Sequence, residues 1–266
     1  MPAIQTARLR QQSALLAEHF NDPTAYVRSL HYLLDFYADR AKRPGQSGKP
    51  EPLIEAYQVH PPVLRLILQE LVPLARNNPE KGFALCDALW KESYLEFRML
   101  ASMLIGQMPV ETAEEITERI KLWIKADLEV QLVDAILTHG LMRLRRERPR
   151  ILENLIQNWL NDTNNFYQQL GLRALLSTIS DPSFENLPAF LHMIQPFMEK
   201  APGVLRPDIL EVVAALAHCS PQETAYYLRQ CLTSRDATDT PWLIRQVLHE
   251  FPPEIQKSLR QSVHNT

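Results

Sequence analysis

The sequence contains little glycine. Only seven glycines occur in 266 residues, although glycine averages about 7% of the residues in proteins. Glycine is the usual residue where a turn needs a positive φ, so turns of that kind should be rare. Residues with high helix propensity, leucine above all, are plentiful instead. This composition predicts an all-α fold.

Cysteine is also scarce. Cys86, Cys219 and Cys231 are too few and too irregularly spaced for a disulfide framework. No Cys/His cluster has the spacing of zinc ligands, so we expect no metal site. The sequence contains no GxGxxG, GxxxxGK[ST] or HExxH motif. We therefore expect no cofactor.

Long apolar runs are absent as well. No window approaches the roughly 18 apolar residues of a membrane span, and the first twelve residues contain no apolar signal core. We expect a cytoplasmic protein that does not contact the membrane. The net charge of -3 and the pI near 6.3 argue against attraction of the whole surface to phosphate. Any contact with DNA must come from a local patch, and the acidic balance also suits a protein partner.

Prolines divide the chain into helical segments. Two amphipathic stretches, residues 3–20 and 24–40, open it. Residues 42–52 read KRPGQSGKPEP and cannot continue a helix, because they hold three prolines and two glycines. We predict a flexible loop there. From residue 53 onward, helical patterns alternate with short breaks at prolines, without strand-like alternation between them.

Large apolar residues recur near the ends of successive helical segments. The steps between them are 33, 36, 38 and 35 residues, counted along Trp90, Trp123, Trp159, Phe197 and Leu232. We interpret these residues as core rather than as ligand-stacking aromatics. The varying step favours a HEAT-like repeat over a TPR. We predict one HEAT-like α-solenoid, an armadillo-like superhelix over residues 1–266, with about five or six helix pairs whose second helices line a concave face.

Two short segments carry a family resemblance. Residues 57–65 read YQVHPPVLR, an aromatic and valine stretch that leads to prolines and a Leu-Arg pair. Residues 89–90 read LW, and residues 96–101 read EFRMLA. In order and spacing these segments resemble the DNA alkylation repair glycosylases, which are built from HEAT-like repeats and usually have glycine at the position of Gln58. The resemblance extends over most of residues 14–232.

The resemblance implies a concave groove that grips duplex DNA by its backbone and excises positively charged alkylated purines. It implies that Asp134 stands at the position of the catalytic aspartate. Val130 and Glu211 stand where the family has two catalytic tryptophans, and Gln169 stands where it has an arginine that grips phosphate. The lone aspartate suggests a member with weak or lost catalysis, in which the carboxylate of Glu211 substitutes electrostatically.

Five arginines lie within eight positions, opposed only by Glu147. They are Arg143, Arg145, Arg146, Arg148 and Arg150. On a continuous helix, Arg145 and Arg148 lie within about 40° of Asp134 around the helix axis. The side chains of Arg143 and Arg146 point in other directions. The planar arginine fork suits phosphate. The alternative is a solvated helix end, where cations complement the macrodipole.

Other second helices also supply candidate donors to DNA. Arg98, Arg206 and Arg245 lie early in three of them, and Gln169 lies at a comparable place. Asp134 would stabilise a sugar cation as the glycosidic bond breaks. Its alternative role is an ordinary ion pair with Arg145 or Arg98.

Three functions remain open on these residues. The leading hypothesis is a DNA-binding protein related to the alkylation repair glycosylases, with weak or lost excision. The first alternative is a HEAT-like scaffold that holds a protein partner on its concave face. The second is an active alkylpurine glycosylase with a rearranged site. On the leading hypothesis the partner is double-stranded or distorted DNA, bound through its backbone.

Overall fold

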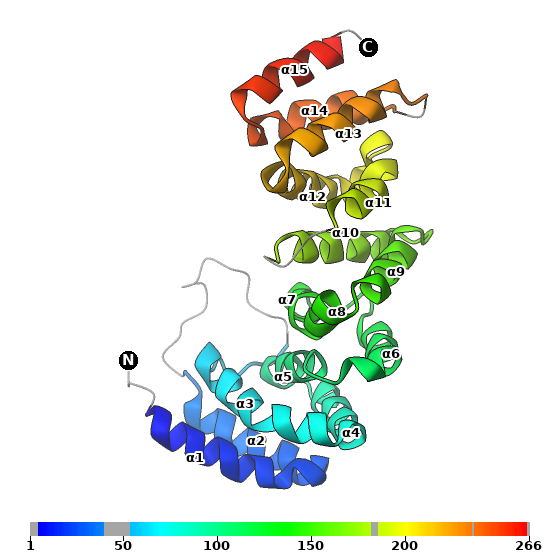
Figure 1. The fold of residues 1–266 in the computed structure, drawn as a ribbon. Helices are drawn as coiled ribbons and strands as arrows, with labels where there is room; N and C mark the ends of the chain where they lie inside the picture. Colours follow the sequence, from blue (N-terminus) through cyan, green and yellow to red (C-terminus); the bar gives the residue numbers. More distant parts are fainter. Residues whose placement is uncertain (1–4, 40–53, 182–185, 236, 265–266) are drawn as a thin grey trace. The chain divides into compact units, whose positions relative to one another are not determined.

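The structure is a computed structural model that describes residues 5–39, 54–181, 186–235 and 237–264. Within these ranges the regular elements are helices, which confirms the predicted all-α class (Figure 1). None of the described helices combines the length and the apolar character needed to cross a membrane. The loop predicted at residues 42–52 lies outside the described residues.

The contacts divide the chain into two compact units, Met1–Pro149 and Arg150–Thr266, and each is described by itself. The single repeat domain over residues 1–266 stays a prediction. The helices of unit 1 are α1 (Thr6–Ala17), α2 (Pro23–Tyr37), α3 (Pro61–Asn77), α4 (Pro79–Lys91), α5 (Leu95–Ile105), α6 (Ala113–Trp123), α7 (Val130–Ala135) and α8 (Met142–Glu147). Those of unit 2 are α9 (Pro149–Leu160), α10 (Asn165–Ile179), α11 (Leu187–Glu199), α12 (Arg206–Cys219), α13 (Pro221–Thr233), α14 (Thr240–Val247) and α15 (Pro253–His264).

Prolines start many of these helices. Pro23 and Pro79 each occupy the first helical turn, where the missing N–H costs nothing. The residue before each proline is a polar cap. Asp22 accepts the backbone N–H groups of Thr24 and Ala25 through Oδ1, both at 3.1 Å, and Asn78 caps α4 in the same way. Several of the breaks seen in the sequence, including those at Pro79, Pro149 and Pro221, are therefore helix starts.

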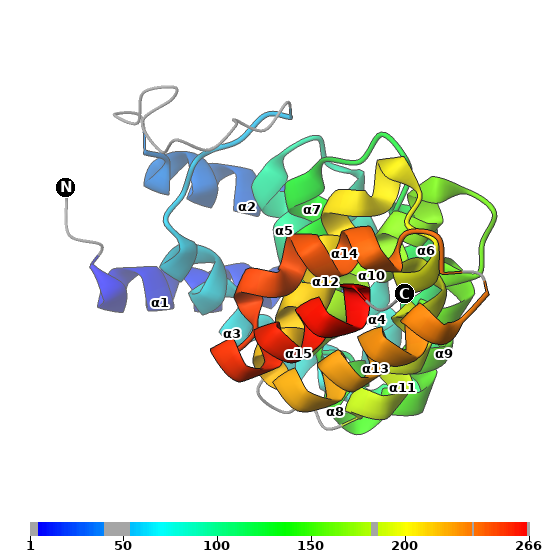
Figure 2. The same cartoon turned by 90° about the horizontal axis from the view of Figure 1, so that it is seen from above.

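The helices stack in two layers within each unit. In unit 1, α1 packs against α3, α3 against α5, and α5 against α7, while α2 packs against α4. In unit 2, α10, α12 and α14 pack in succession, and α11, α13 and α15 form the other layer (Figures 1 and 2). The second helix of each predicted pair is thus α5, α7, α10, α12 or α14. This stacking of helix pairs agrees with the HEAT-like prediction.

The apolar anchors that revealed the repeat are core residues. Trp123, Trp159, Phe197 and Leu232 are buried. The half-buried Trp90 stacks on Trp123, with ring centroids 4.4 Å apart and planes 7° apart. Their interpretation as core is confirmed. Each closes a helix against its neighbours because a large apolar side chain gains most free energy when removed from water.

The second helix that carries Asp134 is interrupted. After α7 the chain forms a π-helical turn, Ile136–Gly140, and α8 begins only at Met142. Within this turn, the N–H of Leu141 donates to the carbonyl of Ile136 at 3.2 Å, an i→i+5 bond. The continuous helix assumed for residues 134–148 is therefore wrong. The wider turn changes the direction of every later side chain, so the angles calculated for Arg145 and Arg148 do not apply.

Candidate DNA-contacting surface

Asp134 lies on the solvent-facing side of α7. The helix buries Leu132, Val133 and Ala135 and leaves Asp134 exposed. Val130, one turn earlier, is 53% exposed. The carboxylate is therefore accessible to a ligand, and the neighbouring position offers a small aliphatic side chain without an aromatic face.

Arg145 folds back onto the π-helical turn. Its Nη2 donates to the carbonyl of Leu137 at 3.0 Å, and its side chain is half-buried. Arg146 and Arg148 are exposed, and Arg148 ends α8. Arg150, also exposed, belongs to unit 2. The cluster is thus spread over a turn, a helix and a helix end.

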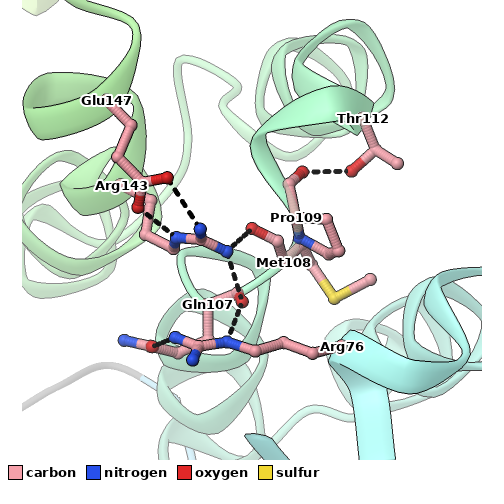
Figure 3. A network of polar contacts seen from close by, with 7 residues as sticks. All are labelled: Arg76, Gln107, Met108, Pro109, Thr112, Arg143 and Glu147. Carbon is pink, nitrogen blue, oxygen red and sulfur yellow. Dashed lines mark hydrogen bonds and ion pairs between the residues drawn. The ribbon is translucent and has the colours of Figure 1, made fainter. Parts of the chain in front are cut away.

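Arg143 takes part in an internal network (Figure 3). Its Nε and Nη2 donate to the two carboxylate oxygens of Glu147 at 2.6 and 2.8 Å, and its Nη1 donates to the carbonyl of Met108 at 2.9 Å. Arg76 of α3 binds the same segment after α5, because it donates to the carbonyl and to the side chain of Gln107, at 3.2 and 3.0 Å. Hydrogen bonding to Arg143 lowers the pKa of Glu147. Arg143 therefore ties α8 to the link that follows α5.

His139, in the π-helical turn, lies in a setting that disfavours its protonated form. Burial lowers its pKa first, and the charges of Arg65 and Arg145 lower it further. Arg65 is an exposed residue of α3 and belongs to the Leu-Arg pair of the family-like segment. It was not among the DNA contacts predicted from the sequence, although that pair was a signal that could have identified it.

Arg98 is held close to its own helix start. Its Nε donates to the carbonyl of Glu92 at 2.8 Å, and its guanidinium carbon lies 5.6 Å from the centroid of the Trp90 ring. The side chain is half-buried. Part of its hydrogen-bonding capacity is therefore used within unit 1.

The two family-like segments meet at Glu96. This side chain is only 4% exposed. It accepts the backbone N–H groups of Tyr57 at 3.0 Å, Gln58 at 2.6 Å and Val59 at 3.4 Å. Gln58 has a φ of 57°, a left-handed conformation that favours glycine. This explains why the family usually has glycine there, and it shows that Glu96 holds the segment against α5.

In unit 2, Gln169 is bound to a buried carboxylate. Asp208 is 8% exposed and accepts Nε2 of Gln169 at 2.8 Å and Nε of Arg173 at 3.4 Å. Arg173 lies one turn after Gln169 on α10, and its side chain is 28% exposed. The resemblance predicts a phosphate-gripping arginine at the position of Gln169, and Asp208 holds Arg173 one turn later on the same helix. The spacing of four residues places both side chains on one helical face.

Arg206, Glu211 and Arg245 lie on the same layer of unit 2. Arg206 donates to the carbonyl of Ala201 and to Asp239, both at 3.2 Å, and stacks 4.4 Å from the centroid of the Trp242 ring. Glu211 of α12 and Arg245 of α14 are exposed. Asp134 and Glu211 belong to different units, so their joint role stays a prediction. Within the described ranges, no group of three or more His, Cys, Asp or Glu side chains is placed to hold a metal ion.

A family model described as DNA alkylation repair enzyme matches residues 39–250. The chain belongs to this family. No curated protein sequence matches the chain. Two solved structures, both described as engineered proteins, are 15% identical in sequence. The match with the first covers 98% of this chain and 69% of that structure's chain, with a TM-score of 0.36. The match with the second covers 97% of this chain and 94% of that structure's chain, with a TM-score of 0.28.

Family membership accounts for the two segments that meet at Glu96 and for the helix order around them. It also supports DNA repair as the general field of function. The individual DNA contacts and the role of Asp134 stay predictions for this member of the family.

Proposed function

We propose that this member of the family binds DNA through its backbone and releases alkylated purines slowly or not at all. The main support is the open surface of α7. It presents Asp134 to solvent but has the aliphatic Val130 one turn earlier. The carboxylate is exposed to solvent, and a valine stands where the resemblance predicts an aromatic side chain.

The DNA contact would come from the arginines around the π-helical turn. Arg65 and Arg145 lie close enough to lower the pKa of His139, and Arg148 is exposed at the end of α8. Such a local patch can attract phosphate although the net charge is negative. Arg143, Arg98 and Arg145 should each contribute less than the exposed Arg65 and Arg148, because all three donate to backbone carbonyls within unit 1.

The chemistry explains why excision should be slow. An alkylated purine that carries positive charge is already a good leaving group, so the protein mainly has to stabilise the sugar cation and position water. Asp134 supplies one negative charge for that purpose. A cation–π contact is worth about 0.5 to 2 kcal/mol, and Val130 cannot provide one.

The binding test is fluorescence anisotropy on plain, abasic and branched duplexes over a range of salt concentrations. We expect weak affinity that falls steeply with salt, because bound arginines release counterions. Replacing Arg145 and Arg148 by alanine should flatten the plot of log K against log salt by about 1 to 2 units. Arg260→Ala, an exposed change on α15, is the matched control and should leave the slope unchanged. Absence of binding at low salt would contradict the proposal and favour a protein partner.

The catalytic test is single-turnover excision from methylated duplex DNA by wild type, Asp134→Asn and Glu211→Gln. We expect slow or undetectable release from the wild type. Robust excision that Asp134→Asn abolishes would show an active enzyme and contradict the weak-activity part of the proposal. Robust excision that survives this change would show that the reaction uses another site.

A further inference from the structure

A groove with mainly apolar walls lies between the first two helices of unit 1. Its volume is about 360 Å³. It is lined by Gln12, Leu15, Leu16 and His19 on one wall and by Ser29, Tyr32, Leu33 and Phe36 on the other. Three of these side chains are exposed to an unusual degree for their size, namely Leu15 at 54%, Tyr32 at 75% and Phe36 at 56%. An exposed apolar cluster of this kind marks an interaction surface more often than a solvated one.

The groove is on a side that the described helices of unit 1 leave uncovered. α1 packs against α3, and α2 packs against α4, so other faces of both helices contribute to the core of unit 1. In helical repeat proteins a face at the end of the array is normally polar, and an apolar one is normally covered by another helix pair. The groove therefore resembles a surface on which another helix pair would pack, and no helix pair in the described part of unit 1 packs there.

Four exposed charged residues surround this groove in a fixed pattern. Arg8 and Glu18 lie two turns before and one turn after Leu15, and Arg28 and Asp35 lie one turn before and one turn after Tyr32. The helices are antiparallel, because Arg8 lies 4.7 Å from the centroid of the Phe36 ring and Gln12 accepts the Tyr37 hydroxyl at 2.6 Å. One end of the groove thus has Arg8 and Asp35, and the other end has Glu18 and Arg28. The charge changes sign from one end of the groove to the other on both sides.

We propose that this face binds the same face of a second copy of the chain. The two-fold axis can lie in the plane of the face in two ways. An axis perpendicular to the helices lays α1 antiparallel on the partner's α1. An axis along the helices lays α1 on the partner's α2. Both arrangements place arginine over acid at all four corners, so the face is complementary in charge to itself. Tyr32 is the side chain expected to enter the groove of the opposite copy, since tyrosine is enriched at interface centres. Only the first two helices of each copy take part in this arrangement, so we expect a weak dimer.

The first test is sedimentation equilibrium of the whole chain from about 1 µM to about 1 mM, the range of weak association. We expect a reversible monomer–dimer equilibrium that Tyr32→Glu or Phe36→Glu abolishes. These positions are exposed, so circular dichroism should show an unchanged helical fold. Tyr226→Glu, a 55% exposed tyrosine on α13, is the control and should leave dimerisation intact. A monomeric wild type, or a dimer that survives Tyr32→Glu, overturns the proposal.

The second test asks which acid of the second copy pairs with Arg8. Arg8→Glu should weaken the dimer by about 2-fold to 30-fold, because each exposed ion pair is worth about 0.2 to 1 kcal/mol and occurs twice across the axis. Adding Glu18→Arg restores affinity if α1 lies on the partner's α1, and adding Asp35→Arg restores it if α1 lies on the partner's α2. Failure of both second changes to restore the dimer overturns the charge-paired interface.

Discussion

The two units differ in how their second helices meet a neighbour at a glycine. In unit 1, a Cβ added to Gly106 would lie 1.8 Å from the carbonyl oxygen of His139, so α5 touches the backbone of the π-helical turn. In unit 2, a Cβ added to Gly171 would meet the side chain of Leu160 at 2.8 Å and its backbone nitrogen only at 3.1 Å. One junction is backbone against backbone, and in the other the glycine packs mainly against the buried side chain of Leu160.

The buried carboxylates of the two units show the same contrast. Glu96 in unit 1 accepts three backbone N–H groups. Asp208 in unit 2 accepts the side chains of Gln169 and Arg173. Unit 1 therefore fixes the backbone around its candidate site, whereas unit 2 orients side chains on regular helices. A fixed backbone tolerates substitution poorly, so we expect the larger losses of stability in unit 1.

The largest effect is expected at the glycine junctions. Gly106→Ala should lower the free energy of unfolding by about 3 kcal/mol or more, because α5 and the π-helical turn must separate. Gly171→Ala should cost less, about 1 to 2 kcal/mol, because the buried side chain of Leu160 must shift although alanine favours the helix. Urea unfolding followed by circular dichroism measures both. Equal losses at the two sites would break the comparison.

The buried carboxylates should give the next largest effect. Glu96→Leu leaves three backbone N–H groups without their acceptor and should cost about 2 to 4 kcal/mol. Asp208→Ala should cost about 1 kcal/mol, because Gln169 and Arg173 are partly exposed and can turn to water. The same unfolding measurement compares them. A larger loss for Asp208→Ala than for Glu96→Leu would contradict the role given to the backbone in unit 1.

A pH dependence should follow from His139 of unit 1. Its pKa is lowered in the folded state by burial, Arg65 and Arg145. Below about pH 6.5, where histidine ordinarily titrates, the unfolded chain binds the proton first. Stability should therefore fall as the pH drops from about 6.5 toward the folded pKa, and the full contribution is present above 6.5. His139→Gln should flatten this part of the profile in urea unfolding between about pH 5 and 7.5.

Removing the charge of Arg65 tests what lowers the pKa of His139. Arg65→Ala should raise the pKa of His139 in the folded chain, and NMR titration of the ring measures the change. An unaltered titration would show that Arg65 lies too far away to form a patch with Arg145.

The smallest effect is expected at Gln58. Replacing it by glycine relieves a left-handed conformation but adds freedom to the unfolded chain, so a net gain of about 0.5 to 1 kcal/mol is expected. Gly203→Ala in unit 2 is the control, because an added Cβ meets nothing within 4 Å, and its effect should be similarly small. Thermal unfolding compares both with wild type, and a loss of stability in Gln58→Gly would show that the glutamine side chain is needed.

Much of the fold could be predicted from local sequence signals. Proline and its preceding cap mark helix starts, and the periodic anchors such as Trp123 and Trp159 mark the core. The candidate site was harder to predict. The sequence marked Asp134 as a candidate but did not predict its exposure, and the directions expected for Arg143 and Arg145 depended on a regular helix that the π-helical turn interrupts.

The sequence by itself determined the all-α class, the repeating helix pairs and membership of a recognisable family, because propensity, capping and apolar periodicity act between neighbours in the chain. Only the tertiary structure decided that Gly106 lies against His139, that Glu96 binds the segment from Tyr57 to Val59, and that Arg143 ties α8 to the link after α5. These contacts join residues more than thirty positions apart. Their geometry depends on how helices pack, which local propensities do not specify.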